Sequence, residues 1–344
     1  MGRKKILFIA TGGTFSSVKT ADGIKPGFGV QEMIDKFPEA QAFADITGVQ
    51  LCHLDSTNVQ PSDWTNFSRC VFEHYDGYDG FVIGHGTDTM AYTAAGLSFA
   101  LAGVRKPIVM TGSALSADHP ETDARENFID SIIAATSPFI QGVSVCFAGR
   151  VIKGTNAHKA AHDADSGRNH IDLFNSMNAP LMARIKNGGI EINSLYRRFN
   201  DNSGHMPLNA NFDTNIGSLM ILPGMGSDVL NSFEHKKAVI IQAFGDGGIP
   251  FVYGSWIEKI EEMKNKGIPV FVVSQTGGAA DMSSYEVGIK AQKAGAISCE
   301  DMTFESVVAK LMWISGNFPL LKNTAFINKF KENIAGEFYA RSPS

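Results

Sequence analysis

Short apolar runs alternate with amphipathic segments through the first half of the chain. The runs are rich in Val, Ile and Phe, as buried strands are, and they cover residues 5–10, 49–53, 80–84, 107–111 and 143–148. The segments between them predict helices over residues 30–37, 62–75, 89–102 and 123–135. Strands that alternate with helices predict a parallel sheet with helices on both faces.

This pattern stops over residues 186–215, where Asn, Gly and Ser replace the apolar runs. We interpret 186–215 as a linker between domains. A second series follows, with strands expected at 218–222, 238–244 and 269–274 and helices at 256–266, 284–294 and 303–314. Thr303 is the expected N-cap of the last helix. The sequence therefore predicts two α/β domains, a larger one over 1–185 and a smaller one over 216–344.

Composition narrows the function classes. The 344 residues include 44% hydrophobic and 19% charged side chains, which excludes disordered, collagen-like and coiled-coil proteins. A net charge of −5 offers no basic surface for nucleic acid or for an anionic membrane. The four cysteines lie far apart without a C-x-x-C pair, which is typical of a reduced, cytoplasmic protein. The apolar run that follows Lys5 is shorter than the roughly 7–15 residues of a signal peptide. We therefore expect a soluble protein of the cytoplasm, with no nucleic-acid or membrane partner.

Four turns that carry hydroxyl groups follow predicted strands, at the sheet edge where ligands bind in parallel α/β folds. They are Thr11-Gly12-Gly13-Thr14, Asp55-Ser56-Thr57, Gly84-His85-Gly86-Thr87-Asp88-Thr89 and Thr111-Gly112-Ser113. Any one of them is explained equally well by capping of the next helix. Four on one edge favour a binding or catalytic role. No glycine-rich phosphate-binding pattern is present, which disfavours nucleotide binding.

A threonine hydroxyl becomes a nucleophile only when a base takes its proton. Lys159 is the candidate base, in an expected loop, although most lysines are simply solvated surface residues. Asp88 directly follows Thr87 at a predicted helix start, where the helix dipole favours a carboxylate. It suits the role of orienting the lysine.

Two of these turns together resemble the paired signature of the bacterial and archaeal asparaginase family: the one from Thr11 to Thr14 and the one from Gly84 to Thr89. Further matches run along the whole chain. They are Leu54-Asp55-Ser56-Thr57, Thr111-Gly112-Ser113 with Asp123 and Asn127, Gly245-Asp246-Gly247-Gly248-Ile249-Pro250 and Asp301-Met302-Thr303-Phe304-Glu305. The sequence is most similar to the cytosolic, type I-like branch. The resemblance implies two α/β domains, the second of them flavodoxin-like.

The activity that the resemblance implies is hydrolysis of asparagine to aspartate and ammonia through an acyl-enzyme on threonine. By position, Thr14 is the nucleophile, and Thr87, Lys159 and Asp88 form a second hydroxyl relay. No metal or organic cofactor is implied.

The same resemblance implies a set of substrate-binding residues. They are Ser56, Thr57, Gly86, Asp88, Ser113 and Ala114. Ser56, Thr57 and Asp88 would hold the α-carboxylate and α-amino groups. The oxyanion site would be built from N–H groups at Gly86 and Thr87, together with the loop at Ser113 and Ala114.

Relatives also close the site with the C-terminal domain of a partner subunit, so a homodimer or a dimer of dimers is expected. The segment 275–285 supplies the candidates for that contribution, Asp281 and Tyr285.

Two segments depart from the family. Ile24 stands where most relatives carry a loop tyrosine, and isoleucine cannot relay a proton. Residues 160–170 are longer and more polar than expected. His158 and His162, with Asp163, Asp165 and His170 nearby, also allow a zinc site, but the Gly, Asn and Asp around them favour a loop over the helix that this spacing needs.

Three alternatives to an asparaginase remain open. Ile24 leaves room for glutamine or for a modified, less polar amide as the substrate. A relative of the asparaginase-like subunit of a tRNA amidotransferase would carry an extra N-terminal domain, for which a first signature at Thr11 leaves no room. A non-catalytic amino-acid sensor would need neither two nucleophile-type threonines nor Lys159.

Overall fold

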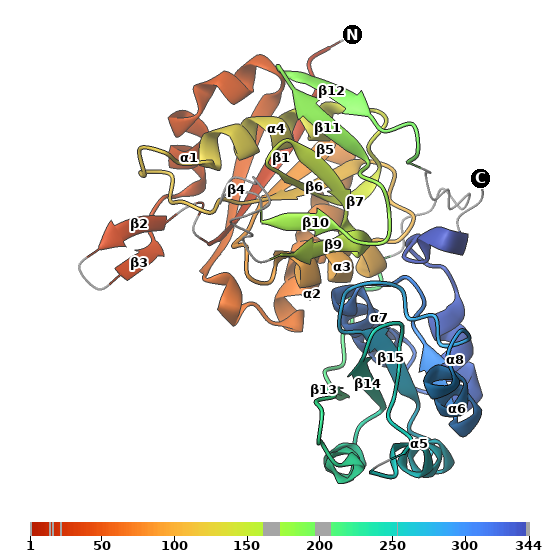
Figure 1. Cartoon of the computed structure of the whole chain (residues 1–344). Helices are drawn as coiled ribbons and strands as arrows, with labels where there is room; N and C mark the ends of the chain where they lie inside the picture. The colour runs from red at the N-terminus through yellow and green to blue at the C-terminus, as the bar shows by residue number, and fades with distance from the viewer. Residues whose placement is uncertain are drawn as a thin grey trace. The chain divides into compact units, whose positions relative to one another are not determined.

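The computed structural model describes residues 2–13, 15, 17–20, 23–160, 173–196, 208–252 and 254–341. The chain folds into two compact units, Met1–Ala210 and Asn211–Ser344, each with its own sheet (Figure 1). A larger, mostly parallel N-terminal sheet and a smaller parallel C-terminal sheet confirm the predicted fold class.

The N-terminal sheet has the strand order β12-β11-β8-β7-β6-β5-β1-β4. Its parallel part consists of β4 (Asp45–Leu54), β1 (Lys5–Gly12), β5 (Gly80–Gly84), β6 (Pro107–Thr111) and β7 (Gly142–Phe147). Its antiparallel edge consists of β8 (Arg150–Lys153), β11 (Ala183–Lys186) and β12 (Gly189–Ile192). The predicted parallel sheet is therefore present, with an antiparallel extension that the apolar runs did not predict.

The strand order reverses at β1, because β4 pairs with one side of β1 and β5 with the other. In open parallel sheets, ligands bind outside the carboxyl ends of the strands at such a reversal. Strand β1 ends at Gly12, inside the first signature turn, and β5 ends at Gly84, the first residue of the second signature turn. The topology thus places the two signature turns side by side at the position expected for a ligand.

Four helices accompany this sheet: α1 (Val30–Lys36), α2 (Pro61–His74), α3 (Met90–Ala100) and α4 (Ala124–Thr136). Side chains of α1 and α4 share a core with the inward residues of β1, and the rings of Phe8 and Phe128 meet edge-on at 5.0 Å. Helix α3 is apolar all round and almost entirely buried. Two short antiparallel pairs complete the unit: β2 (Ser17–Thr20) with β3 (Gly23–Pro26), and β9 (Ala157–Lys159) with β10 (Phe174–Ser176).

The structure corrects the start of the expected linker. Residues 186–192 complete the β11–β12 hairpin instead of leaving the domain. Asn187 and Gly188 both have positive φ, 51° and 72°, as the two central residues of a type I′ turn require. The Asn-Gly pair is thus a hairpin turn here, and the strands beside it are too short and polar to stand out in the sequence.

The C-terminal sheet contains four parallel strands in chain order: β13 (Ile216–Met220), β14 (Ala238–Ala243), β15 (Val270–Ser274) and β16 (Ala296–Ser298). Its helices are α5 (Trp256–Asn265), α6 (Glu286–Ala294), α7 (Phe304–Asn317) and α8 (Asn323–Lys331). Thr303 caps α7 as predicted, since its hydroxyl accepts the Ser306 N–H at 3.1 Å. Across the described residues, no helix combines the length and the hydropathy that a membrane span requires.

Candidate active site

Three residues that the sequence singled out meet beyond the end of β5. Lys159 Nζ lies 2.9 Å from Thr87 Oγ1 and 2.5 Å from Asp88 Oδ1. Lys159 ends strand β9, and is not in a loop as expected, and pairing with Phe174 on β10 fixes its backbone. Thr14, the predicted nucleophile, lies outside the described residues.

The side chains of Thr87, Lys159 and Asp88 differ in how far they are exposed to solvent. Thr87 is only 8% exposed, whereas the side chains of Lys159 and Asp88 are 30% and 52% exposed. An ion pair this open to water stabilises a fold by at most about 1 kcal/mol. The pair therefore matters less for stability than for holding an amine against the buried Thr87 hydroxyl.

Ser56, after β4, supports the same turn from the other side of β1. Its hydroxyl accepts the backbone N–H of Asp88 at 3.2 Å, and its carbonyl accepts the Thr89 hydroxyl at 2.7 Å. Ser56 is buried, and its own O–H has no acceptor among the residues that the structure describes. Thr57 is exposed and bonded to Asp55 through both its N–H (2.9 Å) and its hydroxyl (2.8 Å), which lowers the pKa of Asp55.

Two glycines let the three turns approach one another. A Cβ on Gly13, whose φ is +79°, would lie 2.3 Å from the Cα of Gly86. A Cβ on Gly86 would lie 2.5 Å from Ser56 Oγ. Real Cβ atoms do not come this close to other atoms, so the turns after β1, β4 and β5 can meet only because neither glycine has a side chain.

The turn after β6 carries Ser113 and Ala114. Ser113 is 1% exposed, and its hydroxyl has no hydrogen-bond partner among the described residues. The N–H of Ala114 donates to both carboxylate oxygens of Asp123, at 3.0 and 2.9 Å, so it is not a free oxyanion donor as the resemblance suggested. Within the described part of the chain, the N–H groups of Gly86 and Thr87 have no acceptor. The backbone N–H groups available to an oxyanion are therefore those of Gly86 and Thr87, in the turn after β5.

His85 holds the β5 turn internally. It is fully buried, with Nδ1 2.7 Å from the Gly86 carbonyl and Nε2 3.1 Å from the Thr93 hydroxyl. Because a carbonyl only accepts, Nδ1 carries the proton and Nε2 accepts from Thr93. Burial lowers the pKa of His85 to about 4, so the ring stays neutral near pH 7. These contacts give His85 a structural role in the turn after β5.

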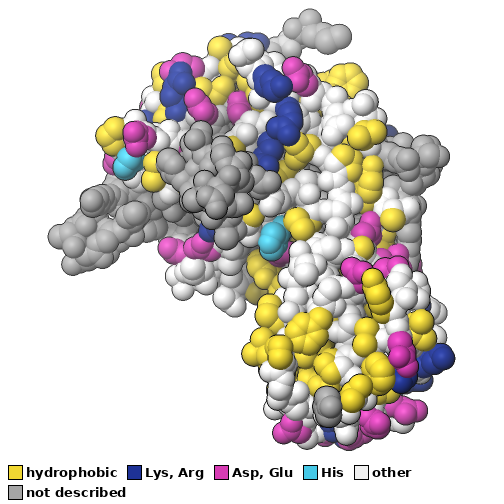
Figure 2. Space-filling model, viewed as in Figure 1, with side chains coloured by type: hydrophobic (Ala, Val, Ile, Leu, Met, Phe, Trp, Pro, Cys, Tyr) yellow, Lys and Arg dark blue, Asp and Glu magenta, His cyan; other side chains and the backbone are white. Residues whose placement is uncertain are grey.

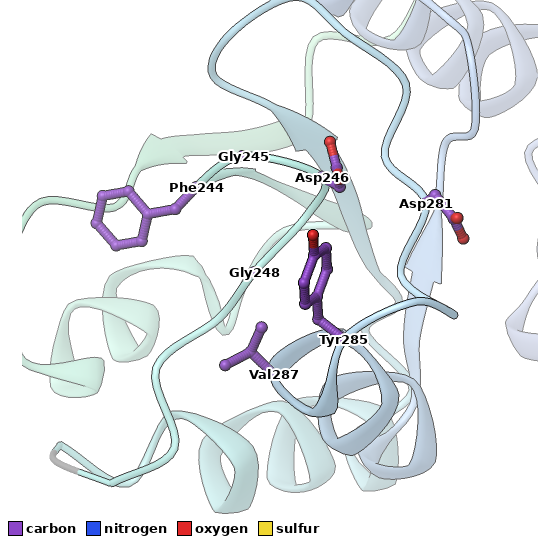
Figure 3. Close-up of a pocket in the computed structure, with 8 residues that line it drawn as sticks. Phe244, Gly245, Asp246, Gly248, Asp281, Tyr285 and Val287 are labelled. Carbon is purple, nitrogen blue, oxygen red and sulfur yellow. The ribbon is translucent and has the colours of Figure 1, made fainter.

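Asp281 and Tyr285 lie in the C-terminal unit, where they line a pocket of about 340 Å³ together with the turn after β14 (Figure 3). Hydrogen bonds from Ser283 and Ser284 lower the pKa of Asp281, and Tyr285 is 62% exposed. The same pocket contains Asp246, which the sequence pointed to only as part of a family match. Its position in the glycine-rich turn after a strand was the signal that could have identified it.

The described residues contain no group of three or more His, Cys, Asp or Glu side chains that could hold an ion, which does not test the zinc alternative. His162, Asp163, Asp165 and His170 lie outside those residues.

Comparison with protein families matches residues 5–197 to "Asparaginase, N-terminal" and residues 215–322 to "Glutaminase/Asparaginase C-terminal domain". The chain belongs to the asparaginase family. It is 33% identical to an L-asparaginase of Thermococcus kodakarensis, over 97% of this chain and 98% of that protein. The solved structure of the thermostable L-asparaginase from Thermococcus kodakarensis has a TM-score of 0.86 at 32% identity, covering 97% of this chain and 98% of that one.

A further relative is named for a different activity. A glutamyl-tRNA(Gln) amidotransferase subunit of Methanobrevibacter smithii is 33% identical over 99% of this chain and 78% of that protein. The family resemblance is confirmed, and the chain is an L-asparaginase-type amidohydrolase.

Proposed function

We propose that this protein hydrolyses the side-chain amide of L-asparagine to give L-aspartate and ammonia. The observation that carries the proposal is the contact of Lys159 Nζ with Thr87 Oγ1 and Asp88 Oδ1, at the switch point of an asparaginase-family sheet. A hydroxyl, an amine and a carboxylate in hydrogen-bond contact are the parts of a proton relay.

The reaction proceeds in two steps. The Thr14 hydroxyl attacks the amide carbon, its proton passes to the departing nitrogen, and ammonia leaves an acyl ester on Thr14. Water then attacks the ester, and aspartate is released as Thr14 regains its proton. In each step the relay of Thr87 and Lys159 takes one proton from the attacking hydroxyl or water and delivers one to the leaving nitrogen or to the Thr14 oxygen, so both residues end the step as they began it. Asp88 stabilises the ammonium form of Lys159, as a carboxylate stabilises the imidazolium of a serine-hydrolase triad.

Both steps build negative charge on the former amide oxygen. The N–H groups of Gly86 and Thr87, which have no acceptor within the described part of the chain, are the donors for that charge. Such donors typically contribute about 2.7–4 kcal/mol each to transition-state stabilisation. The exposed side of the Asp88 carboxylate suits the α-ammonium group, and the O–H of Ser56 suits the α-carboxylate. Thr57 would join it only by exchanging the hydrogen bond that its hydroxyl donates to Asp55.

We also propose a homodimer or a dimer of dimers, in which one subunit's Asp281 and Tyr285 complete another subunit's site. Met220, Leu222, Val252 and Tyr285 are exposed apolar or aromatic side chains of the C-terminal unit. Figure 2 shows such side chains gathered on one face of this unit. An apolar surface of this kind typically marks a protein–protein contact. A cytoplasmic location remains a prediction from the sequence.

A different amide is the second candidate substrate, because Ile24 replaces the loop tyrosine of most relatives. The experiment that separates the candidates measures ammonia release from L-asparagine, L-glutamine and N-substituted or less polar amides. Fastest release from asparagine supports the proposal. If ammonia is released only from another amide, that amide and not asparagine is the substrate. Binding of an amino acid without any release of ammonia favours an amino-acid sensor.

A further inference from the structure

A buried carboxylate behind the site has no role in the chemistry described so far. Asp123 is 6% exposed at the start of α4. It accepts the N–H groups of Ala114 (2.9 and 3.0 Å) and Leu115 (3.0 Å) and the side-chain amide of Asn127 (2.9 Å). A buried carboxylate is costly unless its oxygens are hydrogen-bonded. Here that requirement is met by the turn after β6.

Asn127 holds the other side of the same turn. Its Nδ2 donates to the carbonyl of Gly112 at 3.0 Å, and its Oδ1 accepts the N–H of Ala148 at 2.9 Å. Asp123 and Asn127, one helical turn apart, therefore fix the peptide groups before and after Ser113. The turn owes its conformation to the first turn of α4 as well as to its own residues.

Ser113 is the residue held between these contacts, and its hydroxyl is buried without a partner among the described residues. Burying an unsatisfied hydroxyl is unfavourable unless a ligand supplies the missing partner. The Ser113 turn lies against the relay turn, because Thr111 pairs in register with Gly84 and a Cβ on Gly112 would lie 2.3 Å from the His85 carbonyl.

We propose that Asp123 is a positioning residue: with Asn127 it fixes the Gly112–Leu115 turn so that the Ser113 hydroxyl meets the substrate beside Thr87. The proposal rests on the proposed function. Asp123 itself does not touch the substrate, because its contacts are with the backbone and with Asn127. Its effect on turnover must therefore pass through Ser113.

The test is a double-mutant cycle with Asp123→Asn and Ser113→Ala, read as kcat and KM for ammonia release. We expect each single variant to lower kcat/KM roughly 10- to 100-fold, and the double variant to be within about threefold of the worse single variant, since residues that act through one contact are not additive. Asp118→Asn is the matched control, because that carboxylate lies in the same loop, is exposed and pairs only with Lys36 among the described residues. It should stay within about twofold of wild type.

Losses that multiply in the double variant, or wild-type kinetics for Asp123→Asn, would overturn the proposal. If Asp123→Asn does not fold, Asn127→Ala takes its place in the same cycle with the same expected result. If the wild-type protein releases no ammonia from any amide, the proposed function fails. In that case the affinity of each variant for L-aspartate is measured by calorimetry. Non-additive losses of affinity in the double variant support the positioning role of Asp123. Additive losses, or no binding of L-aspartate by the wild type, overturn it.

Discussion

Lys159 Nζ lies 2.9 Å from Thr87 Oγ1, although 72 positions separate the two residues in the chain. The contact joins the end of β9 to the turn after β5, and the Asp88 carboxylate lies 2.5 Å from the same nitrogen. A flexible lysine side chain loses considerable rotamer freedom when it is held in this way. The hydroxyl, the amine and the carboxylate have different roles, so removing each of them should change catalysis in a different way.

Lys159→Met should lower kcat by about 10²–10⁴-fold, the range lost with a general acid–base group, since methionine keeps the length but cannot take a proton. Asp88→Asn should lower kcat less and raise KM more, because asparagine still accepts a hydrogen bond but offers no charge to an α-ammonium group. The measurement is steady-state ammonia release from L-asparagine, with Lys186→Met on the exposed hairpin as the control. If both site variants change KM alone, the relay is wrong and a binding role remains.

Gly86→Ala should disturb the site by crowding Ser56, whose hydroxyl would lie 2.5 Å from the new Cβ. Overpacking of this kind costs roughly 1–3 kcal/mol in stability, and the Asp88 N–H would lose its acceptor. If a cost of this size falls on the transition state, kcat/KM decreases at least about tenfold, and this is the decrease that we expect. Gly77→Ala is the control, because its Cβ would meet nothing within 4 Å. Equal activity of the two variants would show that the approach of Gly86 to Ser56 has no catalytic importance.

His85 should make the protein less stable in acid. The folded protein keeps the ring neutral down to about pH 4, whereas the unfolded chain takes a proton near pH 6.5. The unfolded state thus binds more protons between these values, and stability falls as the pH drops from 6.5 towards 4, by up to about 3 kcal/mol.

The check is the free energy of unfolding in urea at several pH values for wild type and His85→Gln. Burial raises the pKa of Asp130 to about 6, which acts in the opposite direction, so the difference between the two proteins is the quantity to compare. This difference should depend on pH; if it is constant from pH 4 to 7, His85 is not a buried neutral histidine.

Tyr285→Phe should lower kcat more than fivefold, beyond the roughly 1 kcal/mol of one ordinary hydrogen bond. The reason is that Ile24 cannot relay a proton, and Tyr285 lines the pocket of the C-terminal unit that we propose completes another subunit's site. Tyr78→Phe, a tyrosine of the N-terminal unit beyond α2, serves as the control. An unchanged kcat for Tyr285→Phe would mean that another group replaces the loop tyrosine.

The pattern of apolar residues predicted the five parallel strands. Strands β1, β5, β6 and β7 are continuous apolar runs because they are buried on both faces, whereas β4 lies at the sheet edge, is partly exposed and was predicted only over residues 49–53. The pattern missed β11 and β12, because these strands form a hairpin at the sheet edge that is short and carries polar side chains, with Glu191 opposite Arg184. Lys159 was singled out first as a lysine in an expected loop and then by its position in the family match, because no spacing in the sequence links it to Thr87. The direction of the Ala114 N–H, toward Asp123, depends on how α4 packs beneath the turn and was beyond sequence reasoning.

The proposed amide hydrolysis depends most directly on the Thr87 hydroxyl. Thr87→Val removes that hydroxyl from a turn without opening a core cavity, and Thr14→Ala removes the hydroxyl of the predicted nucleophile. Thr89→Val is the control, because the Thr89 hydroxyl bonds the Ser56 carbonyl and not Lys159. The decisive measurement is kcat for ammonia release from L-asparagine by Thr87→Val. We predict that kcat falls at least about a thousandfold for Thr87→Val and less than about tenfold for Thr89→Val. A Thr87→Val protein that keeps more than about a tenth of wild-type kcat, a deficit below roughly 1.4 kcal/mol, would show that the Thr87 hydroxyl does not act in the reaction.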